Sequence, residues 1–277
     1  MIRETNTHYG TGEAVLRETT CRAALNPTGI PGFDYCMNPY TGCTHACIYC
    51  YASFMCRFTD HREPWGEFLD AKANFPEVLA KQRDSRRKHP EGRVLIGTVT
   101  DAYQPAEERF RLTASSLELL AEYRLLDVHI LTKSDLVRRD IPILLRIPKR
   151  EVGFTITTMD RSVSDILEPG ASQPERRLAA AAELLGSGVA VWVFIAPLLP
   201  GLTDTEEALA ATYGALRNAG IASIRLDRLN PYSGVVRRLE DIYRRRFPQA
   251  TEVLEEYLRH PKDYRRIVAE RLRRVGA

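Results

Sequence analysis

Several features are missing from this 277-residue sequence, and each absence argues against a class of protein. No cysteine follows Cys56, so the chain lacks the dispersed cysteines of a secreted disulfide scaffold. No apolar run reaches the ~18 residues that a membrane span needs. The serine-hydrolase, P-loop and dinucleotide-binding glycine motifs are also absent. Residues 1–10 are polar, without the apolar core of a signal peptide, so we expect a cytoplasmic protein that does not bind membranes.

The charge of the chain is small overall but uneven along the sequence. The formal net charge is +3, whereas residues 231–277 carry twelve basic and seven acidic residues and the remainder has a balance of −2. A basic segment of this kind attracts phosphate groups, although a solvated helix face has the same composition. Nucleic acid is therefore one candidate substrate. The residues that would contact phosphates or stack on bases are Arg237, Arg238, Arg244, Arg245, Arg246, Tyr232 and Tyr243.

All six cysteines lie between residues 21 and 56, and three of them follow the pattern Cys-x3-Cys-x2-Cys. These are Cys43, Cys47 and Cys50, and Pro39 and Gly42 predict a turn just before them. Three thiolates suit a sulfur-seeking centre such as an iron–sulfur cluster or zinc. A four-iron cluster held by only three cysteines leaves one iron open to a substrate or cofactor.

The main alternative is a structural zinc site in a non-catalytic metal-binding or interaction protein. The fourth zinc ligand would be Cys56, Cys36 or His45, but zinc sites usually show two paired knuckles and this sequence has one triplet. A disulfide is a second alternative. Cys21, Cys36 and Cys56 could bind a second cluster, or they could be small buried hydrophobic residues.

Between residues 35 and 230, short β-branched runs alternate with helical patterns. The predicted strands cover residues 93–100, 127–132, 151–158, 189–196 and 223–228, with a first strand that ends near residue 40. The predicted helices cover residues 75–88, 109–123, 141–146, 173–185 and 205–218. Repeated strand–helix units predict an α/β fold with a parallel sheet and helices outside, and six strands suit a partial (β/α)6 barrel of the TIM type.

Three segments follow from this pattern. They are an N-terminal extension (1–34) that packs over the core, the barrel (35–230) and a basic helical C-terminal segment (231–277). Function in such barrels collects where the strands end. Polar residues recur at these ends, in segments 98–105, 132–134, 155–158, 196–201 and 227–230, and the cysteines follow the first strand.

The pattern Cys43-x3-Cys47-x-Tyr49-Cys50 resembles the signature of the radical S-adenosylmethionine (SAM) superfamily. Within that superfamily, residues 20–230 resemble the spore photoproduct lyase-like proteins, also called DNA repair photolyases. The matching segments are residues 38–40, 49–51, 100–105, 132–134, 157–158, 168–169 and 197–201.

The resemblance implies a [4Fe-4S] cluster on Cys43, Cys47 and Cys50 whose open iron binds SAM. An electron, from a reductant such as flavodoxin or ferredoxin, would cleave SAM to methionine and a 5′-deoxyadenosyl radical that abstracts hydrogen from a substrate. Tyr49 would pack on the adenine, and Lys133 would pair with the SAM carboxylate. The implied cofactor-binding residues are Tyr49, Thr98, Thr100, Asp101, Lys133, Ser134, Thr155, Thr157 and Pro197.

One departure from the family concerns the hydrogen donor. Spore photoproduct lyases use a cysteine at the end of the second strand, and the corresponding residues here, 97–101, contain none. The O–H bond of Thr98 is too strong to replace a thiol. Tyr51 is the remaining catalytic candidate, and Cys56 is a second one if its loop folds back into the barrel. We therefore expect a radical SAM enzyme with an unidentified substrate, of lyase or transferase class, rather than a spore photoproduct repair enzyme.

Overall fold

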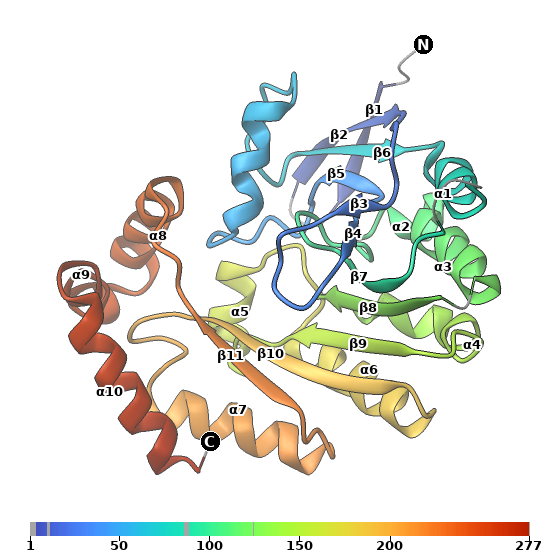
Figure 1. Ribbon diagram of the computed structural model, residues 1–277. Coiled ribbons are helices and arrows are strands. Elements are labelled where there is room, and N and C mark those ends of the chain that lie inside the picture. Colours follow the sequence, from blue (N-terminus) through green and yellow to red (C-terminus); the bar gives the residue numbers. More distant parts are fainter. Residues whose placement is uncertain (1–3, 10–11, 86–88, 124, 277) are drawn as a thin grey trace.

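Seven strands form the main sheet of the protein, which we describe from a computed structural model over residues 4–9, 12–85, 89–123 and 125–276 (Figure 1). The sheet order is β11-β10-β9-β8-β7-β4-β3. All neighbours from β4 to β11 are parallel, and only β3 runs antiparallel to β4. The bounds are β3 (Asn26–Pro27), β4 (Tyr35–Met37), β7 (Gly92–Ile96), β8 (Leu126–Thr132), β9 (Arg150–Thr155), β10 (Ala190–Leu198) and β11 (Ile224–Arg228). The six parallel strands confirm the predicted partial barrel.

Alternating β-branched residues explain why these strands form where the sequence predicts them. Val94 pairs with Val128 across β7 and β8, and Ile130 pairs with Val152 across β8 and β9. All four side chains are fully buried in the main hydrophobic core. Successive side chains of a strand point to opposite faces, so apolar residues at every second position give the strand an apolar face that packs in the core.

The helices lie around the outside of the sheet (Figure 1). Their bounds are α1 (Phe75–Arg83), α2 (Glu107–Phe110), α3 (Leu112–Glu122), α4 (Ile141–Leu144), α5 (Arg161–Leu167), α6 (Pro174–Gly186) and α7 (Glu206–Asn218), with the 3-10 helices η1 (Tyr51–Phe58) and η2 (Asp135–Asp140). The helix predicted over residues 109–123 is interrupted, because Arg111 adopts a left-handed conformation with φ 50°. Residues 86–88 of the predicted first helix lie outside the described part of the chain. Helix α5 was not predicted.

The N-terminal part of the chain also forms a second sheet, which the sequence did not predict. Its order is β1 (Glu4–Tyr9), β2 (Gly12–Thr19), β6 (Phe68–Lys72) and β5 (Tyr40–Gly42). The predicted end of the first barrel strand near Tyr40 is therefore wrong: β4 ends at Met37, and Tyr40 already belongs to the second sheet. Gly42, with φ 86°, then turns the chain into the cysteine segment.

The C-terminal segment is helical, as predicted, and packs against the strand-end loops. It comprises α8 (Ser233–Arg246), η3 (Pro248–Ala250), α9 (Thr251–Arg259) and α10 (Pro261–Arg274). Tyr243 donates a hydrogen bond to the Pro200 carbonyl at 2.9 Å and is fully buried, so its predicted role in base stacking is wrong. Among the described helices, none has the length and apolar character to cross a membrane.

Candidate functional site

The three cysteines of the triplet lie on one loop between β5 and η1. Cys43 and Cys47 are buried, Cys50 is partly exposed, and all six cysteines of the chain are free thiols. The loop docks onto the segment after α5, where the Ile48 amide donates to the Leu167 carbonyl at 2.9 Å and the Gly170 amide donates to the His45 carbonyl at 3.0 Å. A Cβ atom at Gly170 would collide with the Thr44 carbonyl, so this close approach needs glycine.

Residues after β7 hold the other side of the cysteine loop. The Thr100 hydroxyl donates to the Gly42 carbonyl at 2.5 Å. The Gln104 side chain accepts from the Thr44 amide at 2.9 Å and donates to Thr100 Oγ1 at 3.0 Å. Both side chains are buried, so these hydrogen bonds fix the loop in the interior rather than at a solvated surface.

Asp101 is a buried carboxylate with a full set of donors. It accepts from Thr132 Oγ1 at 2.7 Å, from the Lys133 amide at 2.7 Å and from the Tyr103 amide at 2.9 Å. His45 Nδ1 lies 3.3 Å from Asp101 Oδ2, the oxygen that also accepts from the Lys133 amide. Burial raises the pKa of Asp101, but the His45 ring and the hydrogen bonds lower it more, to about 2. Asp101 therefore joins the ends of β7 and β8 to the cysteine loop.

Tyr49 is positioned by a buried charged network. Its hydroxyl lies 3.0 Å from Thr157 Oγ1 and donates to Glu168, which forms an ion pair with Arg177. Glu168 and Arg177 are only 3% and 1% exposed. Burial raises the pKa of Glu168, but the charges of Arg177 and Lys133 have the larger, opposite effect and lower this pKa to about 2.

The Lys133 ammonium lies 5.5 Å from the centroid of the Tyr49 ring, within cation–π range. The aromatic ring of the cysteine loop and the ammonium group that follows β8 are therefore close together.

The surroundings of the cysteine sulfurs fit thiolates bound to a cluster. Backbone hydrogen bonds within the loop hold the cysteines: the Ala46 amide donates to the Cys43 carbonyl at 3.3 Å, and the Cys50 amide donates to the Cys47 carbonyl at 3.1 Å. Burial, together with the charges of Asp101 and Cys50, raises the pKa of Cys43 to about 12, so a thiolate here needs a positive partner.

The geometry also discriminates between a cluster and a single ion. Within the described ranges, no three His, Cys, Asp or Glu side chains converge closely enough to hold one metal ion. In a four-iron cluster each cysteine binds a different iron, so the sulfurs stand farther apart than around zinc. The donor set therefore fits a cluster better than the zinc alternative.

The remaining predicted cofactor residues have partners within the protein. Thr98 Oγ1 accepts from Asn38 at 2.8 Å, and Ser134 Oγ accepts from the Leu136 amide at 3.2 Å and caps η2. The Thr155 carbonyl accepts from Arg177 at 3.0 Å. Pro197 lies in β10 next to Ala196, whose carbonyl accepts from Thr157 at 3.1 Å. The structure thus brings Tyr49, Lys133 and Thr157 together, whereas the Thr98 side chain joins Asn38 across 60 positions and that of Ser134 caps η2.

The predicted catalytic residues Tyr51 and Cys56 both lie on η1. The Tyr51 hydroxyl donates to the Thr98 carbonyl at the end of β7, and its ring is 48% exposed. It borders a hollow of about 470 Å³ between η1 and α8. The hollow's aromatic and basic lining residues are Tyr51, Phe54, Arg57, Tyr232 and Arg238. Cys56 is partly buried and does not line this hollow.

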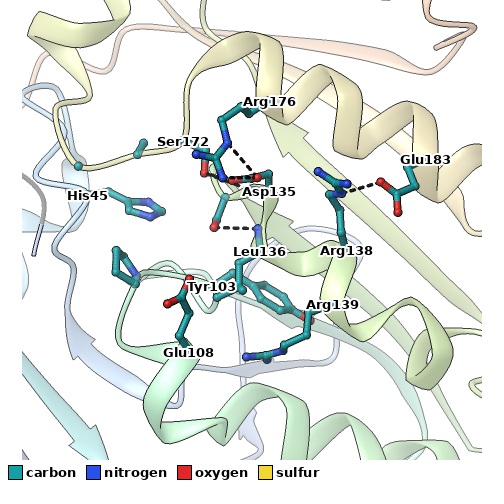
Figure 2. Close-up of a pocket in the computed structure, with 14 residues that line it drawn as sticks. His45, Tyr103, Glu108, Asp135, Leu136, Arg138, Arg139, Ser172, Arg176 and Glu183 are labelled. Carbon is teal, nitrogen blue, oxygen red and sulfur yellow. Dashed lines mark hydrogen bonds and ion pairs between the residues drawn. The ribbon is translucent and has the colours of Figure 1, made fainter.

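A second pocket of about 540 Å³ lies behind the cysteine loop (Figure 2). Figure 2 shows His45 at one side of it and Arg176 and Arg138 at the other. Arg176 is paired with Asp135 at 2.8 Å, and Arg138 is paired with Glu183 at 2.6 Å. Because these charges neutralise one another, we place the candidate site at the cysteine loop and not in this pocket.

Three important residues escaped the sequence reasoning, and a fourth, Arg238, was predicted as a phosphate contact and not as a partner of the cysteine loop. Gln104 and Glu168 lie inside the segments that carry the family resemblance, and that resemblance could have identified them. Arg177 and Arg238 carry no local signal, because Arg177 meets Glu168 only through the fold of the chain between α5 and α6, and Arg238 contacts a residue 190 positions away.

Comparison with known proteins identifies the family. The Radical SAM superfamily profile matches residues 37–212. An uncharacterized protein of Methanocaldococcus jannaschii is 36% identical over 188 residues, which cover 68% of this chain and 69% of that protein. An uncharacterized protein of Mycobacterium bovis is 33% identical over 221 residues, which cover 76% of this chain and 63% of that protein.

The fold also has solved neighbours. A spore photoproduct lyase variant with bound AdoMet and dinucleoside spore photoproduct superposes with a TM-score of 0.65 at 19% identity, and the match covers 83% of this chain and 66% of that one. Several of these proteins therefore extend beyond the matched region by a third of their length or more. The cysteine signature, the parallel partial barrel and the profile match agree, and the chain belongs to the radical SAM superfamily.

Proposed function

We propose that this protein is a radical SAM enzyme in which Cys43, Cys47 and Cys50 bind a [4Fe-4S] cluster. The observation that carries this proposal is the loop itself: it holds three cysteines, two of them buried, and the hydrogen bonds of the Ile48 amide and the His45 carbonyl fix it to the segment around α5. When bound, the cluster and SAM would supply a 5′-deoxyadenosyl radical for hydrogen abstraction, with an electron from a flavodoxin or ferredoxin.

The protein's own residues bind and orient SAM in this proposal. Tyr49 presents its ring to the adenine, because Thr157 and Glu168 hold its hydroxyl from behind. Lys133 places its ammonium beside that ring, where it can pair with the SAM carboxylate. Thr100 and Asp101 contribute indirectly, since their side chains hold the cysteine loop.

For the substrate, we propose a nucleic acid bound at the hollow between η1 and α8. Tyr51 and Tyr232 are 48% and 54% exposed there, and Arg57 stacks on Phe54 at 5.4 Å from its ring centroid. Exposed aromatic rings beside arginines are the usual means of binding unpaired bases and phosphates. The basic helix α8 extends this surface. Residues 97–101 contain no cysteine, so we do not propose repair of spore photoproduct.

The deciding experiment is mass spectrometry of SAM products after anaerobic cluster reconstitution and reduction. We expect 5′-deoxyadenosine from the wild type and none from Cys47→Ala. The matched control is Cys21→Ala, which removes a thiol outside the triplet and should retain both iron and activity. A wild-type protein that takes up zinc without iron and sulfide, and leaves SAM intact, would instead establish a metal-stabilised binding protein.

A further inference from the structure

An arginine of the C-terminal segment reaches the cysteine loop from 190 positions away in the sequence. Arg238 Nε donates to the Ile48 carbonyl at 2.9 Å, and its Nη2 donates to the Cys50 carbonyl at 3.0 Å. The same Nη2 donates to Ser53 Oγ at 2.9 Å, and that hydroxyl itself donates to the Cys50 carbonyl at 2.9 Å. One guanidinium therefore spans the loop on both sides of the third cysteine.

Arg238 is held in place by the helix that carries it. Val235 and Leu239, which flank it on α8, are buried in the main core. Tyr243, one turn further on, is anchored to the Pro200 carbonyl. The position of the guanidinium is thus determined by packing and not by the loop alone.

The charge of Arg238 is not neutralised by a carboxylate in the described part of the chain. Its three hydrogen-bond acceptors are two carbonyls and a hydroxyl. The guanidinium lies beside the third cysteine, since its Nη2 is 3.0 Å from the Cys50 carbonyl oxygen. Because these acceptors are neutral, none of them offsets the positive charge that Arg238 brings to the cysteine site.

We propose that Arg238 is a positioning residue of the cluster site that fixes the Cys50 loop and raises the reduction potential of the cluster. The inference rests on the proposed function, since it requires a cluster on the triplet. A cluster gains negative charge on reduction, so a fixed cation beside one of its ligands favours the reduced form. The hydrogen bonds to the Ile48 and Cys50 carbonyls also resist opening of the loop and loss of iron.

Two variants separate charge from hydrogen bonding. Arg238→Gln removes the charge, whereas Arg238→Lys keeps the charge but lacks the planar fork that spans the acceptors. We would measure the midpoint potential of the reconstituted full-length protein by redox titration with electron paramagnetic resonance, and the rate of iron release to a chelator. The control is Arg259→Gln, an exposed arginine of the same segment that pairs with Glu256.

For Arg238→Gln we expect an oxidised-to-reduced equilibrium shifted about tenfold toward the oxidised cluster, or roughly 59 mV for one electron. Arg238→Lys should keep a potential near that of the wild type and still release iron faster. A cluster in Arg238→Gln with the wild-type potential and iron-release rate would overturn the inference while leaving the proposed function intact. A wild-type protein that assembles no cluster would overturn both. If Arg238→Gln does not fold, Arg238→Lys decides the case, because wild-type iron retention in that variant would refute the role of the three hydrogen bonds.

Discussion

The buried pair of Glu168 and Arg177 gives the sharpest stability prediction. The two side chains are 3% and 1% exposed, and they connect the β9 end to the ring of Tyr49. Glu168→Gln keeps the shape of the side chain but leaves the Arg177 guanidinium buried without a counter-charge. Removing one partner of a buried ion pair costs about 3–5 kcal/mol of unfolding free energy. At about 2 °C per kcal/mol for a chain of this size, the melting temperature should fall by roughly 6–10 °C.

Urea unfolding followed by circular dichroism measures this loss. The matched control is Glu118→Gln, which breaks an exposed pair with Arg146 and should cost at most about 1 kcal/mol. Adding Arg177→Leu to Glu168→Gln should restore part of the stability, because the unpaired charge is then gone. Equal losses for Glu168→Gln and Glu118→Gln would refute the reasoning, since burial would then make no difference.

Three further predictions concern other parts of the molecule. Gly170→Ala should lower the iron bound per chain after reconstitution, because a Cβ atom there would displace the Thr44 carbonyl. The control is Gly214→Ala on α7, where a Cβ atom meets open space and should stabilise the protein by up to about 1 kcal/mol. Burial and Arg93 lower the pKa of His129 despite its contact with Glu151 at 2.9 Å and the charge of Asp127. The unfolded chain therefore binds the proton better, so the free energy of unfolding should fall as the pH drops through about 6.5. In His129→Asn, unfolding measured at several pH values should show a weaker dependence of this free energy on pH. Binding of single-stranded oligonucleotides should weaken steeply with salt, and Arg237→Gln should reduce the log–log slope by about one if that exposed arginine contacts a phosphate.

Local patterns predicted much of the fold. The alternation of Val94 with Ile96 and of Val128 with Ile130 identifies buried strands, because side-chain direction in a strand has a period of two. Helix α5 was missed although Asp160 caps it, accepting from the Ser162 amide at 2.8 Å. The end of the first barrel strand and the pairing of the second sheet were missed because β4 in the main sheet and β5 in the second sheet have only three residues each. Strands that short form through pairing with distant partners and not through their own propensity.

The features of the site also divide into those that local sequence predicts and those that depend on tertiary contacts. The sequence by itself determined the cysteine spacing, Tyr49 within it and the polar residues at strand ends, since each depends on residues adjacent in the chain. Only the tertiary structure decided that Thr100 and Asp101 hold the loop and that Tyr243 is buried. Arg238 reaches Cys50 across 188 positions, a contact that exists only because α8 packs back on the barrel. The physical reason is that hydrogen bonds and ion pairs depend on distance in space, which local sequence patterns do not encode.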